Sequence, residues 1–267
     1  MRKKIVPLLL GLLNTMVVTA LAVSFALLAA RALRTTRVEP PVAVFLVPLY
    51  VAGARWIERR SATEMRLASF PIGVGGGTLV GAALFASVMG ILWLAGAYHW
   101  SGWGAPPPLA TMFLSVLAGA ATEEIVFRGF LFRLVAAAGG NWTALAVTSA
   151  LFGLAHINNR GATVTSSAAI ALEAGILLGA AYAAAGSLWL PIGIHAGWNF
   201  AEGPLFGTAV SGHVQQASLL AGQLQGSVLL TGGAFGPEAS IAAVGVCLAA
   251  SAVFLRRMTQ GCQYNGI

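Results

Sequence analysis

Long apolar runs dominate this chain, and short polar stretches separate them. A run of about 20 apolar residues is long enough to cross the hydrocarbon core of a bilayer as an α-helix. The pattern predicts helices over residues 5–30, 41–54, 70–98, 109–138, 142–156, 166–185, 188–200 and 239–254. It therefore predicts an all-α, polytopic membrane bundle of about eight transmembrane helices.

The composition supports lipid as the solvent of this protein. The chain is 58% hydrophobic and only 9% charged, whereas a soluble domain is about 25% charged. The net charge of +7 raises the question of nucleic-acid binding. The basic residues lie between apolar runs instead of along one face, which is typical of loops at membrane surfaces. We therefore expect no nucleic-acid partner.

The distribution of Arg and Lys predicts the orientation of the chain. Alternate loops differ in their content of basic residues, and the richer set includes both terminal segments. Because cytoplasmic loops carry an excess of Lys and Arg, we expect a multi-pass protein of the cell membrane with both termini in the cytoplasm. The glycine-rich stretch 203–237 is expected to be a loop or partly re-entrant.

Glycines and other small residues have two interpretations in this sequence. Gly175, Gly179 and Ala183 recur at near-helical spacing, which favours close packing of helices. The run from Gly73 to Gly77 follows no strand and is interpreted as a source of helix flexibility, not as a phosphate-binding loop.

Ionisable side chains are concentrated in a few predicted helices, although each costs about 2.5–3.5 kcal/mol at membrane depth on insertion scales. Glu124 and Arg128 are four residues apart, so they share a helix face and can form an ion pair. Glu123 lies about 140° from Arg128 and has no such neighbour on its own helix. We expect the pair to be architectural and Glu123 to be free for chemistry. The alternative is that all three only hold helices together.

Two further motifs place polar side chains four residues apart. Phe152 and His156 share one face, as do His195 and Asn199. Taken singly, a histidine at a helix end is more often interfacial, and a His–Asn pair can be only an interhelical hydrogen bond. Together with Glu123 they supply a carboxylate, two imidazoles and a carboxamide, which is the inventory of a hydrolytic site. Such a site requires a polar, hydrated cavity within the bundle.

The remaining acidic and imidazole groups receive other interpretations. Glu173 lies in a predicted helix without an evident partner; it can line the cavity but is not expected to be catalytic. Glu202, His213 and Glu238 fall in or next to the glycine-rich stretch, where we expect solvated roles.

The polar side chains form three motifs: Glu123-Glu124-x-x-x-Arg128, Phe152-x-x-x-His156 and His195-x-x-x-Asn199. In this order they resemble the CAAX-processing and bacteriocin-processing (CPBP, or Abi) family of intramembrane peptidases, in its bacterial branch. The resemblance is strong over 109–200 and weaker through LFGTAVSG and GGAFGPEAS. It implies two parts, residues 1–108 with helices that carry no recognised motif and 109–267 as a CPBP-like peptidase core.

The resemblance implies a peptidase that cleaves a membrane-associated peptide or protein near the bilayer surface. Carried over by position, Glu123 is the general base, His156 helps to hold the attacking water, and His195 and Asn199 bind the oxyanion. One such oxyanion donor changes the rate by about 10²–10³. The supporting residues are Glu124, Arg128 and Phe152.

Alternatives remain for the cofactor and for the class of function. We expect no cofactor, but Glu123, His156 and His195 are ligand types that a catalytic zinc site uses, although the HExxH spacing of zincins is absent. Intramembrane Glu and His residues also serve proton relays, so a proton-coupled transporter or channel is one alternative to a peptidase. A non-catalytic family member that binds other membrane proteins is another.

Overall fold

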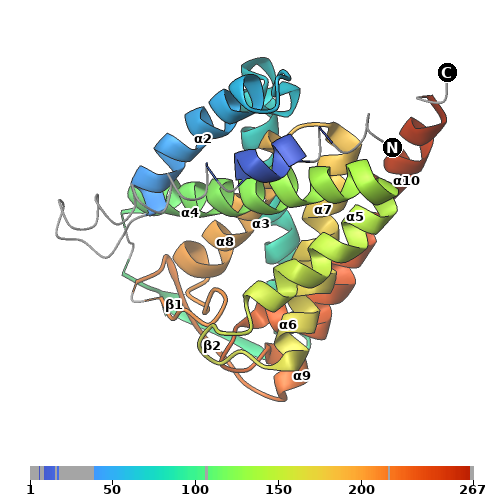
Figure 1. The fold of residues 1–267 in the computed structure, drawn as a ribbon. Coiled ribbons are helices and arrows are strands. Elements are labelled where there is room, and N and C mark those ends of the chain that lie inside the picture. The colour runs from blue at the N-terminus through green and yellow to red at the C-terminus, as the bar shows by residue number, and fades with distance from the viewer. Residues whose placement is uncertain are drawn as a thin grey trace.

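The structure, a computed structural model, is a bundle of α-helices with one small sheet at its edge (Figure 1). It describes residues 6, 9–15, 17, 39–105, 108–215 and 217–264. Most of the predicted first span, 5–30, lies outside the described residues.

Helices form most of the described chain. The α-helices are α2 (Glu39–Trp56), α3 (Phe70–Leu94), α4 (Leu109–Glu124), α5 (Arg133–Ala155), α6 (Val164–Ile170), α7 (Ile176–Ala185), α8 (Trp189–Phe200), α9 (Val228–Thr231) and α10 (Ile241–Tyr264). Wide π-helical turns lie at Ile125–Phe132, Ala171–Gly175 and Ala201–Leu205. Short 3₁₀ turns lie at Thr63–Met65, Leu67–Ser69 and Pro237–Ala239.

Several of these helices fit a membrane. Four continuous helical stretches of the described chain are long and apolar enough to cross one: Leu67–Leu94, Leu109–Ala155, Val164–Ala185 and Ile241–Thr259. A shorter apolar helix covers Val44–Trp56. Large side chains such as Ile72 and Leu79 are about three-quarters exposed or more, as expected where lipid is the solvent. The expectation of an all-α membrane bundle is confirmed.

The longest helical stretch, Leu109–Ala155, is two arms joined at a sharp bend. Gly140 has φ 82° and ψ 169°, which is outside the helical region and costs little only for glycine. The chain changes direction there, from α4 and the first part of α5 into the second part of α5 (Figure 1). The bend falls between the predicted helices 109–138 and 142–156.

Glycines bring α3 and α8 into backbone contact. A Cβ atom on Gly81 would lie 2.0 Å from the Ile194 carbonyl oxygen, and one on Gly197 would lie 2.1 Å from the Thr78 carbonyl oxygen. On Gly77 it would lie 2.7 Å from the Leu190 carbonyl oxygen. The interpretation of Gly73–Gly77 as flexible is therefore wrong at Gly77, which is a packing position.

Two strands, absent from the predicted pattern, form an antiparallel pair. β1 (Tyr98–Trp103) follows α3, and β2 (Leu220–Leu224) lies in the glycine-rich stretch. Trp100 and Trp103 on β1 are exposed, which suits the interface between lipid and water. The stretch expected to be a loop or partly re-entrant thus contains a strand that pairs with a distant part of the chain.

We predict that Gly81→Ala destabilises the bundle, because the new methyl group collides with the backbone of α8. Overpacking of this kind lowers the free energy of unfolding by about 1–3 kcal/mol. Gly76 in the same helix is exposed, with nothing within 4 Å of an added Cβ. Gly76→Ala is therefore the matched control and leaves stability equal or up to about 1 kcal/mol higher. Equal melting temperatures of the two variants in detergent would contradict the packing role.

Candidate active site

A buried ion pair between Glu124 and Arg128 lies at the centre of the site. Arg128 Nη1 donates to Glu124 Oε1 at 2.9 Å, and neither side chain has exposed surface. Arg128 Nη2 also donates to the carbonyl oxygens of Ala174 at 3.3 Å and Gly175 at 3.1 Å. The pair expected from the four-residue spacing is thus present, and it also ties the end of α4 to the segment between α6 and α7.

Local backbone geometry makes this approach feasible. The π-helical turn Ala171–Gly175 interrupts the regular hydrogen-bond ladder, so carbonyl groups become available to an outside donor. Gly175 also permits close contact with α5, because a Cβ atom there would lie 2.8 Å from Ser149 Cα. Gly153 does the same from α5, since its Cβ would lie 2.2 Å from the Ser167 carbonyl oxygen.

Glu124 also holds His195. The Nδ1 atom of His195 lies 3.0 Å from Glu124 Oε1, and the imidazole is buried. Because Arg128 keeps Glu124 as an acceptor, Nδ1 carries the hydrogen and donates it. The remaining nitrogen, Nε2, is an acceptor in neutral His195 and a donor when the ring is protonated.

Phe152 packs against the charged groups and both imidazoles. Its ring is almost fully buried, 4.6 Å below the Arg128 guanidinium carbon. The ring centroids of His195 and His156 lie 6.1 Å and 4.8 Å from that of Phe152. His156 Nδ1 lies 2.7 Å from the Phe152 carbonyl oxygen and so donates to it, which leaves Nε2 as the acceptor of neutral His156.

Glu123 differs from Glu124 in facing a cavity, although Oε2 of Glu124 also has no hydrogen-bond partner among the described residues. The Glu123 side chain is half-buried, and its buried Oε2 atom has no hydrogen-bond partner among the described residues. It lines a partly polar cavity with an empty volume of about 1090 Å³, together with His156, Asn199 and His213. The carboxylate is therefore available to a water molecule or a substrate in this cavity.

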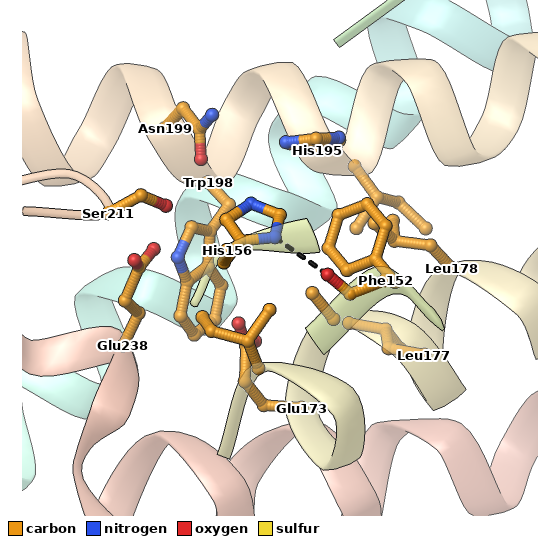
Figure 2. A pocket seen from close by; sticks show the side chains of 13 residues that line it. Phe152, His156, Glu173, Leu177, Leu178, His195, Trp198, Asn199, Ser211 and Glu238 are labelled. Atoms are coloured by element: carbon orange, nitrogen blue, oxygen red, sulfur yellow. Dashed lines mark hydrogen bonds between the residues drawn. The ribbon is translucent and has the colours of Figure 1, made fainter. Parts of the chain in front are cut away.

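A second, smaller cavity adjoins the first. It has an empty volume of about 390 Å³, and its walls include His156, His195 and Asn199 (Figure 2). Asn199 and His195 lie on the same helix, α8, with His156 facing them in the view of Figure 2. His156 and Asn199 line both cavities, whereas Glu123 lines only the larger and His195 only the smaller.

The geometry can be tested against the zinc alternative. Glu123, His156 and His195 do not form a ligand cluster: within the described part of the chain no three His, Cys, Asp or Glu side chains are placed to hold a metal ion. Each imidazole donates from Nδ1 to a protein oxygen, which leaves Nε2 as the ring atom able to bind a metal or a substrate. The positions of the three residues relative to one another, and not these hydrogen bonds, do not fit a zinc site.

Two acidic residues, Glu202 and Glu238, have environments that the sequence analysis did not predict. Glu202 and Glu238 are buried instead of solvated, and Glu173 is buried as well. Glu173 and Glu238 line the smaller cavity (Figure 2). The sequence signal was the run Gly-Gly-Ala-Phe-Gly-Pro before Glu238, because a glycine-rich turn can bring a loop carboxylate into the bundle.

Fold and site together define a membrane-embedded helical protein with carboxylate, imidazole and carboxamide groups at a cavity. Residues 103–201 match the model of a protease family, described as type II CAAX prenyl endopeptidase Rce1-like. All three motifs lie within the matched segment. The resemblance to CPBP intramembrane peptidases is thereby confirmed, and this segment is of the CAAX intramembrane protease type. No curated protein and no solved structure matches the chain.

We predict a large loss of stability when Glu124 is replaced and little change when the adjacent Glu123 is replaced. Glu124→Ala leaves Arg128 as a buried, unpaired charge, which lowers the free energy of unfolding by about 3–5 kcal/mol. Glu123→Ala removes a carboxylate whose Oε2 has no hydrogen-bond partner in the described part of the chain, and it changes stability by less than about 1 kcal/mol. Thermal unfolding of both purified variants in detergent measures the difference. A Glu123 variant as unstable as the Glu124 variant would show that Glu123 is structural.

Proposed function

We propose that the protein is an intramembrane endopeptidase in which Glu123 activates the water that hydrolyses a peptide bond. The observation that supports this most directly is the Glu123 carboxylate, which lines a partly polar cavity together with His156 and Asn199 and whose Oε2 has no hydrogen-bond partner among the residues that the structure describes. The adjacent Glu124 bonds to Arg128 and His195 through Oε1 and is not among the residues that line this cavity, so we assign it no proton transfer. In this proposal Glu124 therefore has a structural role, and the neighbouring Glu123 has the catalytic role.

In the proposed first step, water binds between the Glu123 carboxylate and Nε2 of His156. Both groups are acceptors, so each takes one water hydrogen and the oxygen lone pair is left for the substrate carbonyl carbon. Glu123 accepts the proton as the carbon–oxygen bond forms. It then delivers this proton to the amide nitrogen as the carbon–nitrogen bond breaks. General acid–base catalysis of this kind contributes about 10²–10⁴ in rate.

The oxyanion of the tetrahedral intermediate is bound from α8. Asn199 donates through its amide group. His195 donates through Nε2, and because its Nδ1 hydrogen is already given to Glu124, this requires the protonated ring. The Glu124 carboxylate stabilises that imidazolium. Glu124 is thus a positioning residue that sets both the orientation and the charge of His195.

The proposed substrate is a membrane-associated peptide or protein, including one with a prenylated C-terminal segment of the CAAX type that the family description names. An apolar groove of about 1010 Å³ empty volume is lined by side chains of α2, α3, α4 and α8. Helices α4 and α8 also carry Glu123 and His195. A lipid chain in this groove therefore lies on the same two helices as the proposed catalytic groups.

We predict that Glu123→Gln abolishes cleavage without unfolding the protein, because the amide cannot accept the water proton. The assay uses the purified protein in detergent with a farnesylated, internally quenched peptide ending in a CAAX sequence. We expect kcat to fall by about 10²–10⁴ with the melting temperature unchanged. Full activity of a folded Glu123→Gln variant would remove Glu123 from the mechanism.

We further predict that hydrolysis needs no bound zinc, since Glu123, His156 and His195 do not form a ligand cluster. Elemental analysis of the purified protein should show less than stoichiometric zinc. Treatment with a chelator should leave cleavage of the same peptide unchanged. Stoichiometric zinc together with chelator-sensitive activity would refute the metal-free mechanism.

A further inference from the structure

Two buried carboxyl groups that follow the family-matched segment have no part in the mechanism above. Glu202 has no exposed surface and Glu238 is 3% exposed. Within the described ranges, neither forms an ion pair with a lysine or arginine. Burying an ionised carboxylate without a cation is very costly, so the two groups must lower that cost in another way.

The two carboxyl groups lie against one another. Trp198 Nε1 donates to Glu202 Oε2 at 3.1 Å. The other oxygen of Glu202, Oε1, lies close to Gly236: a Cβ atom on this glycine would be 3.4 Å from it. Gly236 has φ 125°. This glycine turn leads into Pro237–Ala239 and brings Glu238 within hydrogen-bonding reach of Glu202.

A hydrogen bond between two carboxyl groups needs one proton. The Oε1 atoms of Glu202 and Glu238 receive no hydrogen bond from any N–H or O–H group of the described residues. A single proton on one carboxyl group satisfies both, because the acid donates and the carboxylate accepts. The pair then carries one negative charge instead of two.

This pair adjoins the proposed active site through Ser211. Glu238 and Ser211 line the smaller cavity with His156 (Figure 2). Ser211 has φ 46°, a left-handed conformation that costs energy in a residue other than glycine and persists only when its surroundings hold it. The Gly212 amide donates to the Phe235 carbonyl oxygen at 2.7 Å, so the turn at Ser211 is attached to the segment that carries Glu238.

We propose that Glu202 and Glu238 form a carboxyl pair sharing one proton, and that Glu238 is a positioning residue that holds the Ser211 turn against His156 during hydrolysis. The catalytic part of this inference rests on the proposed function. The shared proton does not, and it can be tested on the folded protein alone.

Several groups face the pair and act on its titration. They are Ser211, His156 at the end of α5, and Glu173 in the segment between α6 and α7, whose carboxylate accepts from Cys247 of α10 at 3.4 Å. Burial raises the pKa of both Glu202 and Glu238, and repulsion from Glu238 raises the pKa of Glu202 further. The hydrogen bonds from Glu202 and Ser211 act in the opposite direction on Glu238.

The direction of these shifts gives the sign of the pH dependence. A carboxyl group whose pKa is raised by folding binds more protons in the native state than in the unfolded state. Stability is therefore full below the ordinary glutamate range and is lost as the pH rises toward the raised pKa. Above the raised pKa both carboxyl groups are ionised. Repulsion from Glu202 then displaces Glu238, which separates Glu238 from the turn at Ser211.

The first test measures melting temperature against pH for the wild type and Glu202→Gln in detergent. The glutamine amide donates permanently to Glu238 and imitates the protonated acid. We expect the wild-type melting temperature to fall as the pH rises and that of Glu202→Gln to fall less. Glu173 is present in both proteins, so the difference between the curves isolates the pair. Parallel curves would overturn the shared proton.

The second test measures kcat and KM for the farnesylated peptide across pH. Glu238→Ala should lower kcat by on the order of 10²-fold through misplacement of the His156 region, with KM little changed. In the wild type we expect kcat to fall at alkaline pH, and in Glu202→Gln this fall, the alkaline limb of the pH profile, should occur at higher pH. A lower kcat in Glu238→Ala without any move of that limb in Glu202→Gln would show a merely structural role and overturn the positioning assignment. If the Glu123→Gln test fails instead, the melting curves still decide whether the proton is shared.

Discussion

The carboxylate of Glu124 is the interaction on which the arrangement of this site depends. One oxygen of this buried group accepts from both Arg128 and His195. Through Arg128 it reaches the carbonyl groups of the π-helical turn at Ala174 and Gly175. The cost of burying the charge is offset only while all these partners are in place. A single anion thus fixes the relative positions of α4, α8 and the segment between α6 and α7.

Close helix packing places the partners around this anion. Between membrane helices the hydrophobic effect gives little drive for association, so dispersion contacts at short range have to supply it. The glycines between α3 and α8 and those between α5 and the 166–175 segment permit such contacts. His195 therefore reaches Glu124 because α8 rests on the backbone of α3. The site is supported by a helix that carries none of its chemical groups.

Local spacing explains how much could be predicted from the sequence. Helix ranges followed from apolar runs, and the Glu124–Arg128 pair followed from a separation of four residues, since both depend on one helix only. The bond between His195 and Glu124 depends on how two helices meet, and the burial of Glu202 and Glu238 depends on a glycine turn at Gly236. Such features are set by tertiary contacts between distant residues. The sequence could indicate the inventory of the site but not these bonds.

The pairing of β1 with β2 has a consequence for how the bundle assembles. The two strands join residues 98–103 to 220–224 by backbone hydrogen bonds, and Glu123, His156, His195 and Asn199 all lie on the chain between them. Linking the ends of a long segment restricts the conformations open to everything inside it. While the strands are paired, helices α4 to α8 lie within a closed segment of the chain. A pair of short strands at the edge of the bundle can in this way favour the meeting of catalytic groups that they never touch.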